Sequence, residues 1–207
     1  WVDDPAGAWQ VWKHPREGAK YLLVGDVASG TAQEEPDKNH RSWSIITVQD
    51  RSTYEVMAEY RARIDPHKLG IEMVNAGYYF NNGMLCPENN NYGHVTIRCI
   101  VEDQQYPHMF DTTLIGATAK EKEYGFPTKN PVKEHCISAL RNAIENMVYH
   151  ENCKGAVDEM RNSVRNKVGD IVAQTGWLDR MMTRAIGFYV LKFCTLDGSY
   201  RESGDES

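Results

Sequence analysis

Short apolar runs and longer helical stripes alternate along the chain. Residues 21–24 form an apolar run too short for a globular helix, which favours a buried strand that leaves the core near Asp26. Residues 42–48 and 53–61 flank the polar segment 49–52, a composition typical of a hairpin. We therefore expect three consecutive antiparallel strands at the start of the fold.

Helical periodicity dominates the rest of the chain. Asp65-Pro66 offers an N-cap and a first-turn proline for one helix. Residues 84–88 predict a fourth strand, 106–110 a fifth short strand or edge, and 167–173 a hairpin around Gly169-Asp170. Helices are expected at residues 65–80, 94–101, 131–149, 155–164 and 177–193. Together these elements make an α/β chain.

Length and composition fit one domain with a core of its own. The chain has 207 residues, of which 41% are hydrophobic. We expect an extended lead-in at 1–19, a domain at 20–194 and a polar, disordered tail at 195–207. No run approaches the ~20 apolar residues of a membrane span, and the first residues lack a basic segment followed by an apolar one. We therefore expect a soluble protein.

Charge and cysteine usage narrow the function classes. A net charge of −6 argues against a protein whose main task is to grip a phosphate backbone, although a separate basic patch could still do so. The five cysteines form no Cys-x-x-Cys pair, which argues against a zinc site or a disulfide framework and favours buried thiols in a reducing compartment. The chain has no Gly-x-x-x-x-Gly-Lys-Ser/Thr segment, so it offers no recognisable nucleotide-binding P-loop.

Three carboxylates stand at the ends of predicted elements. Asp26 ends the first strand, Glu88 ends the fourth, and Asp179 opens the last helix. If the first and fourth strands are parallel neighbours, their carboxyl ends lie at one edge of the sheet, where ligands collect. Oxygen ligands suit Mg²⁺, and two such ions about 3.5 to 4 Å apart support hydrolysis at phosphorus. Each acid alone has a structural alternative: a turn cap, a partner for loop amides, or a charge at a helix start.

Several motifs resemble one protein family. The most specific is Glu88-Asn89-Asn90-Asn91-Tyr92-Gly93, which is similar to the family pattern Glu-x-Asn-x-x-Gly. Further matches occur in the expected order at residues 21–30, 42–46, 106–107, 125–129, 160–164 and 176–182. Over residues 20–194 the chain resembles the C-terminal nuclease domain of tailed-phage large terminase subunits.

This resemblance implies a ribonuclease H-like fold, a mixed sheet of three antiparallel strands followed by parallel strands and flanked by helices. It implies a metal-dependent endonuclease that cleaves double-stranded concatemeric viral DNA with two Mg²⁺ or Mn²⁺ ions. Asp26, Glu88 and Asp179 would be the catalytic metal ligands. Where the family commonly has two adjacent acids, this chain has Leu178 and Asp179, so Asp170 is the reserve candidate. His94 and His108 are expected to be surface or core residues.

The resemblance also suggests partners. The ATPase domain of the motor is expected on another part of the protein, with the portal and the small terminase as partners, in the cytoplasm of the infected bacterial host. Lys120 and Lys122 are also candidates, but Lys122 alternates with Glu121 and Glu123 in a long loop, which favours solvated charges. The basic residues favoured for DNA contact are Lys129, Lys133, Arg161, Arg165 and Lys167.

Two other functions stay open. One is another nuclease of the same fold, such as a Holliday-junction resolvase or an integrase. The other is a non-catalytic packaging domain, whose acids are structural and whose acidic surface docks other proteins.

Overall fold

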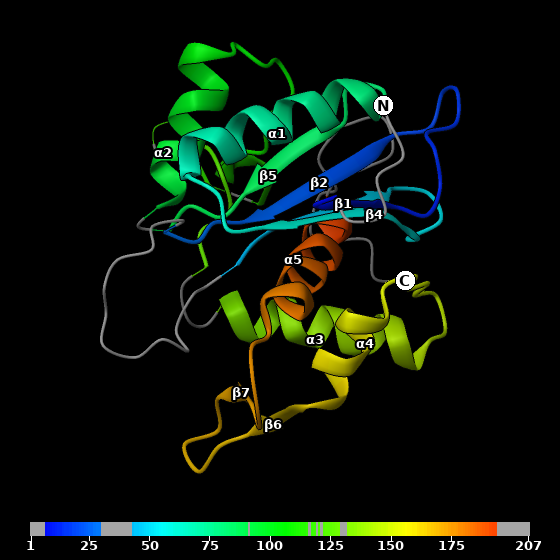
Figure 1. Cartoon of the computed structure of the whole chain (residues 1–207). Helices are drawn as coiled ribbons and strands as arrows, with labels where there is room; N and C mark the ends of the chain where they lie inside the picture. Colours follow the sequence, from blue (N-terminus) through cyan, green and yellow to red (C-terminus); the bar gives the residue numbers. More distant parts are fainter. Residues whose placement is uncertain are drawn as a thin grey trace.

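A five-stranded mixed sheet forms the centre of the molecule (Figure 1). The computed structural model describes residues 7–29, 43–90, 92–115, 117–118, 120, 122–128 and 132–193. The strand order is β1-β4-β3-β2-β5. The bounds are β1 Trp9–Val11, β2 Tyr21–Asp26, β3 Ser44–Asp50, β4 Val56–Ala62 and β5 Met84–Pro87.

The register of the sheet brings two strand ends together. β2, β3 and β4 are consecutive and antiparallel, as the hairpin pattern predicts. β5 pairs with β2 in parallel, with Gly25 beside Pro87. Asp26 directly follows Gly25, and Glu88 directly follows Pro87. Both acids therefore lie at the same edge of the sheet.

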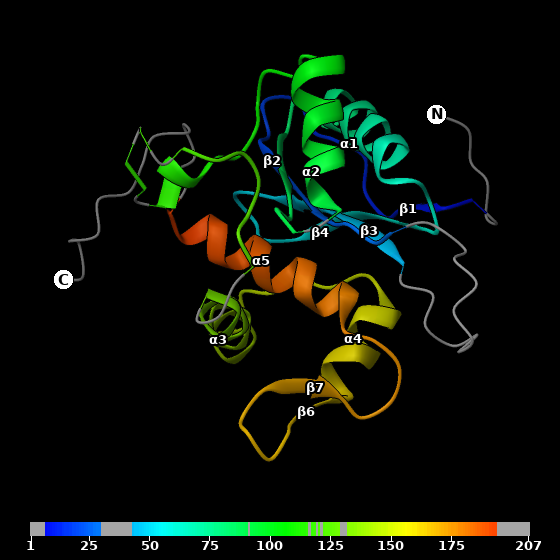
Figure 2. The same cartoon turned by 90° about the vertical axis from the view of Figure 1, so that its left-hand side faces the viewer.

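Helices cover both faces of the sheet in separate layers (Figures 1 and 2). One face carries α1 and α2, and α2 continues into a π-helical turn at Cys99–Asp103. The opposite face carries α5, and α3 and α4 pack on α5 from outside. The bounds are α1 Pro66–Tyr79, α2 Gly93–Arg98, α3 Val132–Glu145, α4 Lys154–Arg161 and α5 Asp179–Phe193, with a 3-10 turn at Thr112–Ile115.

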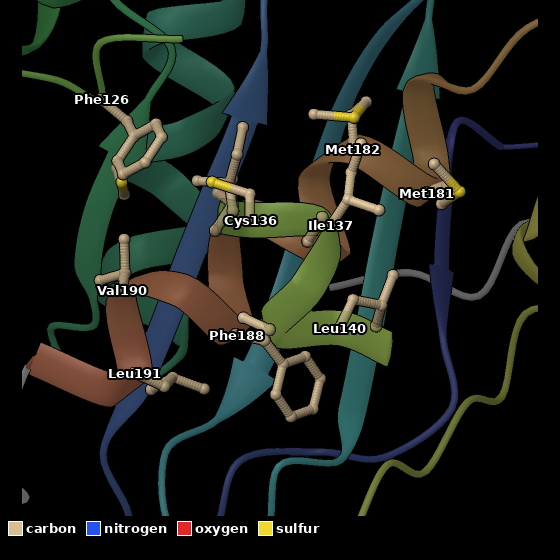
Figure 3. Close-up of a cluster of buried hydrophobic side chains, with 14 of the residues drawn as sticks. Phe126, Cys136, Ile137, Leu140, Met181, Met182, Phe188, Val190 and Leu191 are labelled. Carbon is tan, nitrogen blue, oxygen red and sulfur yellow. The ribbon is translucent and has the colours of Figure 1, made fainter. Parts of the chain in front are cut away.

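The alternation of β2 side chains builds two hydrophobic cores. Tyr21 and Leu23 point towards α1, whereas Leu22 and Val24 join the core formed by α3 and α5. Figure 3 shows the second core, in which Cys136 and Leu140 from α3 meet Met182 and Phe188 from α5. The remaining side chains labelled there are Phe126, Ile137, Met181, Val190 and Leu191. Because β2 is buried on both faces, its sequence is a continuous apolar run.

The structure departs from the predicted elements at several places. The lead-in contributes β1, an unpredicted edge strand that pairs with residues 58–60 of β4. Residues 106–110, expected as a short strand or edge, form an edge contact and no full strand. Only Met109 bridges Leu85, and beyond β5 the next bridge, at Glu88, is made by Phe126. The helix expected at 131–149 ends at Glu145.

The predicted hairpin is present but begins earlier. Its strands are β6 Ser163–Arg165 and β7 Ile171–Ala173, which pair antiparallel and project beyond α4 (Figures 1 and 2). The helix expected to reach residue 164 therefore ends at Arg161. Four cysteines of the described residues are buried and in no disulfide, as the composition indicates: Cys86, Cys99, Cys136 and Cys153. Cys194 and the tail at 195–207 lie outside the described residues. Across the described residues, no helix is long and apolar enough to cross a membrane.

Candidate metal centre

Glu88 is fixed at the end of β5 by its own loop. The Glu88 backbone N–H donates to the Gly25 carbonyl at 2.7 Å, which joins the exits of β5 and β2. Asn90 Nδ2 donates to Glu88 Oε2 at 2.9 Å, while Asn90 Oδ1 accepts from the Gly93 N–H at 3.0 Å. One asparagine side chain thus links the carboxylate to the start of α2.

Gly93 is required by this arrangement. A Cβ at this position would lie 1.9 Å from the Glu88 carbonyl oxygen, and that oxygen belongs to the backbone and cannot rotate away. Each residue of the Glu-x-Asn-x-x-Gly pattern therefore has a local role. Glu88 supplies the carboxylate, the Asn90 amide orients it, and Gly93 allows α2 to begin close to the Glu88 backbone.

A segment from much later in the chain completes this side of the site. The Phe126 N–H donates to the Pro87 carbonyl and the Asn89 N–H to the Phe126 carbonyl, both at 2.8 Å, so this segment extends the sheet beside Glu88. The Thr128 hydroxyl lowers the pKa of Glu88, although its oxygen is not aligned for a full hydrogen bond. A cavity of about 780 Å³ opens here, lined by Asn89, Asn90, His94, Ile97, Glu123, Tyr124, Pro127 and Thr128. His94 therefore faces the cavity as an exposed residue.

Asp179 reaches the same region from the first turn of α5. Its pKa is raised by burial and lowered by Arg61, by Arg180 and by the backbone N–H of Trp43. Leu178, in the place of the second family acid, packs against the hydrophobic core. The first turn of α5 therefore offers one carboxylate to the site.

Glu159 of α4 is a fourth acid that the sequence analysis misses. Its Oε2 accepts from the Met181 N–H at 3.0 Å, which satisfies an open donor in the first turn of α5. Its Oε1 lies 3.6 Å from Arg180 Nη1. Glu159 also raises the pKa of Asp26, so it lies within electrostatic range of the other acids. No spacing signal in the sequence links residue 159 to residue 26.

The acids repel one another in a site where Glu88 is buried and Asp26 and Asp179 are partly buried. Burial raises the pKa of Asp26 well above its usual value, and Glu88, Asp179 and Glu159 raise it further. Burial likewise raises the pKa of Glu88 to about 7. Lys133 at the start of α3 opposes both shifts. Buried carboxylates with raised pKa values favour a bound cation, and a set of oxygen donors suits a hard divalent ion.

The oxygens of these acids are spread over the site. In the part of the chain that the structure describes, one group of three potential ligands has all its ligand atoms within 4.8 Å of one another, and it is His67, Cys99 and Asp103. His67 Nε2 lies 2.9 Å from Asp103 Oδ2, in the helix layer on the other face of the sheet from α5. Asp26, Glu88 and Asp179 are therefore electrostatic neighbours but do not form so tight a cluster.

The structure separates Asp170 from these acids. Asp170 is exposed in the loop of the β6–β7 hairpin, where its backbone N–H donates to Asn166 Oδ1 at 2.9 Å. That hairpin projects away from the sheet (Figure 2). The reserve ligand is thus not brought together with Asp26 and Glu88.

The predicted DNA-contacting residues are dispersed. Lys133 lies near the acids, and Arg165 forms an ion pair with Glu134 at 3.1 Å. Arg161 and Lys167 are exposed near the hairpin. Among the loop residues, Lys120 is exposed, Lys122 pairs with Asp111 at 3.1 Å, and Lys129 lies outside the described residues.

Solved structures share this fold. The chain matches the large terminase nuclease from thermophilic phage G20c with bound magnesium, at a TM-score of 0.67 and 18% identity over 89% of this chain and 88% of that one. The Thermus phage P74-26 large terminase nuclease domain matches at a TM-score of 0.64 and 18% identity, over 89% and 86% of the two chains. The G20c nuclease with bound zinc gives 0.65 at 16% identity, over 89% of both chains. No protein-family model and no curated protein matches the sequence.

The architecture is therefore that of the large terminase nuclease domains, a ribonuclease H-like fold. The mixed sheet expected from the motifs is confirmed: β2, β3 and β4 are antiparallel, β1 adds a further antiparallel strand, and β5 pairs in parallel with β2.

Proposed function

We propose that this chain is the metal-dependent endonuclease of a phage large terminase, and that it cuts double-stranded concatemeric viral DNA during genome packaging. The observation that supports this best is the convergence of Asp26, Glu88 and Asp179 from β2, β5 and α5 at one edge of the sheet. The shared fold adds weight, since the G20c nuclease has been crystallised with magnesium, cobalt and zinc.

Asp26, Glu88 and Asp179 would hold two Mg²⁺ or Mn²⁺ ions. Bound ions of this kind activate water and neutralise charge on the phosphate oxygens during in-line hydrolysis.

The other residues position the acids and the substrate. Asn90 holds the Glu88 carboxylate, while the Trp43 N–H and the Glu159 cap fix the start of α5 beside it. Lys133 places a positive charge near Asp26 and Glu88, where it limits their mutual repulsion and can attract a phosphate. Water, and no side chain of the protein, would be the nucleophile.

The cellular setting follows from the same proposal. The nuclease would act in the cytoplasm of the infected host. Its partners would be double-stranded DNA, the ATPase domain of the motor, the portal and the small terminase. Residues 20–194 would form the nuclease domain, between the lead-in and the polar tail.

Cleavage of plasmid DNA in Mg²⁺ or Mn²⁺ tests the proposal. Asp26→Asn, Glu88→Gln and Asp179→Asn should each lower the rate by at least about 100-fold, because each removes a charge from the metal centre. Asp170→Asn is the matched control and should cleave like the wild type, since Asp170 is exposed on the hairpin. Undiminished cleavage by Asp26→Asn and Glu88→Gln would reject the site.

Substrate choice separates the rival functions. A terminase nuclease should cut linear duplex DNA with little sequence preference, whereas strong preference for a four-way junction would indicate a resolvase. A wild-type domain that binds no metal and cuts no DNA would instead favour a packaging interaction domain.

A further inference from the structure

Two arginines stack on one tryptophan beside the candidate metal centre. The Cζ of Arg61 lies 4.0 Å from the centroid of the Trp43 ring, and the Cζ of Arg63 lies 4.4 Å from it. Arg61 and Arg63 are two residues apart along β4 and its end, so they project from the same face of the sheet. Ser44 pairs with Ala62, which brings Trp43 level with Arg63. The stack is thus built by the sheet register.

Neighbouring arginines on this face are already neutralised. Arg180 Nε lies 2.7 Å from Glu59 Oε1, and Arg184 lies between Glu59 and Glu151 at 2.7 and 3.0 Å. Within the described part of the chain, neither Arg61 nor Arg63 forms an ion pair with a carboxylate. Arg63 therefore keeps its charge available to a ligand. Arg61 also interacts electrostatically with Asp179, Glu59 and Glu159, but no carboxylate of the described residues holds it in an ion pair.

Stacking also determines how the guanidinium groups can bind. An arginine that lies over an aromatic ring uses its flat face for the contact and leaves its N–H edge open, which matches the oxygens of a phosphate. A lysine cannot reproduce both interactions. The arrangement is therefore more selective for a phosphodiester than a pair of flexible surface charges.

A hollow lies beside this stack, and the Glu59 carboxylate that pairs with Arg180 also lines it. Its volume is about 410 Å³, and its lining includes Trp43, Arg61, Arg63 and Arg180. The Trp43 N–H and Arg61 both act on the Asp179 carboxylate, so the hollow adjoins the α5 side of the site. A DNA strand with one phosphodiester at the acids would have a flanking phosphate near this hollow.

We propose that Trp43, Arg61 and Arg63 form a clamp for the backbone phosphates of the DNA strand that flank the scissile bond, on the Asp179 side. This inference rests on the proposed nuclease function. It assigns the substrate contact to the start of β3 and the end of β4, and not to the β6–β7 hairpin. It also accounts for DNA binding by a chain whose net charge is −6, because the attraction is local.

Binding of a labelled DNA duplex, measured by fluorescence anisotropy over a range of salt concentrations, tests the clamp. The measurements use Glu88→Gln protein, so that DNA is not cut. The double variant Arg61→Ala, Arg63→Ala should weaken binding at least about tenfold and reduce the salt slope by about two. Arg61→Lys with Arg63→Lys should restore the slope but only part of the affinity, because a lysine ammonium neither stacks flat on Trp43 nor offers two parallel N–H donors to a phosphate.

The matched control removes two exposed basic residues near the hairpin, Arg161→Ala with Lys167→Ala, and should leave the slope within experimental error. If this control lowers the slope and the Arg61, Arg63 variant does not, the clamp is refuted and the hairpin holds the DNA. The single variant Arg63→Ala keeps the test valid if the double variant fails to fold, because Arg63 is exposed. It should lower the slope by about one.

Cleavage kinetics separate this inference from the function on which it rests. With the catalytic acids intact, Arg63→Ala should raise KM several-fold with a nearly unchanged kcat, and the double variant should raise KM about tenfold or more, whatever the loss of Arg61 does to kcat through Asp179. A fall in kcat without a change in KM or in DNA binding would mean that Arg61 acts on Asp179 alone, and would overturn the clamp. Absence of any metal-dependent cleavage by the wild type would reject the nuclease function itself.

Discussion

Glu88→Gln should make the metal-free protein more stable at alkaline pH while abolishing its activity. Glu88 is 7% exposed and its pKa is raised to about 7, mainly because burial disfavours the charged form. The folded state therefore binds a proton more tightly than the unfolded chain does. The resulting stabilisation is complete below the ordinary Glu pKa of 4.5 and is lost as the pH rises through about 7.

The size of the effect follows from that pKa difference. A rise from 4.5 to about 7 corresponds to roughly 3 kcal/mol of folding free energy. Glutamine carries no charge and its side-chain oxygen can still accept from Asn90, which now donates at 2.9 Å. Above pH 8 the variant should therefore exceed the wild type by up to about 3 kcal/mol, or roughly 6 to 12 °C in melting temperature for a chain of this size. Near pH 4.5 the two should melt together.

The assay is thermal unfolding with EDTA from pH 4.5 to 8.5, repeated with Mn²⁺. The metal should stabilise the wild type more as the pH rises and should stabilise Glu88→Gln little, because the charged ligand is absent. Glu102→Gln, a change at an exposed glutamate, is the matched control and should stay within about 0.5 kcal/mol at every pH. A variant less stable than the wild type at pH 8.5 without metal would refute the reasoning.

Three further predictions concern positioning and stability. Gly93→Ala should cost about 1 to 3 kcal/mol and most of the activity, since its Cβ would lie 1.9 Å from the Glu88 carbonyl oxygen; melting and plasmid cleavage together test this. Arg184→Ala should cost about 3 to 5 kcal/mol in denaturant unfolding, because it leaves the buried Glu151 carboxylate without its arginine and the buried Glu59 with Arg180 alone. Mn²⁺ at 100 times its Kd should stabilise the wild type by about 2.7 kcal/mol, and no such shift is expected for Asp26→Asn.

Local signals made part of the site predictable. The acids Asp26 and Glu88 follow apolar runs that the sheet buries, so their place at strand ends could be expected from hydrophobic pattern alone. The Asn90 and Gly93 contacts are also local, within five residues of Glu88. Such contacts involve only neighbouring residues, so they produce a short motif that can be recognised without knowledge of the rest of the fold.

Contacts between residues far apart in the sequence produce no such motif and could not be predicted in this way. Glu159 acts on Asp26 and on the first turn of α5 only because α4 packs on α5. Arg61 was hidden for a related reason: in sequence it ends an ordinary strand, and its meeting with Trp43 depends on the β3–β4 register. The edge strand β1 was missed because three residues are too few to show a period of two.

The net acidity of the chain does not arise from the charges at this edge of the sheet. Buried acids such as Glu59 and Glu151 are matched by Arg180 and Arg184, which ties α5 to the sheet and leaves these charges unavailable to a ligand. The charges that face the site are Asp26, Glu88 and Asp179 on one side, with Lys133, Arg61 and Arg63 around them. Each of these two groups contains as many acids as cations, so the net charge of −6 arises elsewhere in the chain and does not describe the attraction of this edge for DNA. The relevant quantity is the charge that has no partner inside the fold.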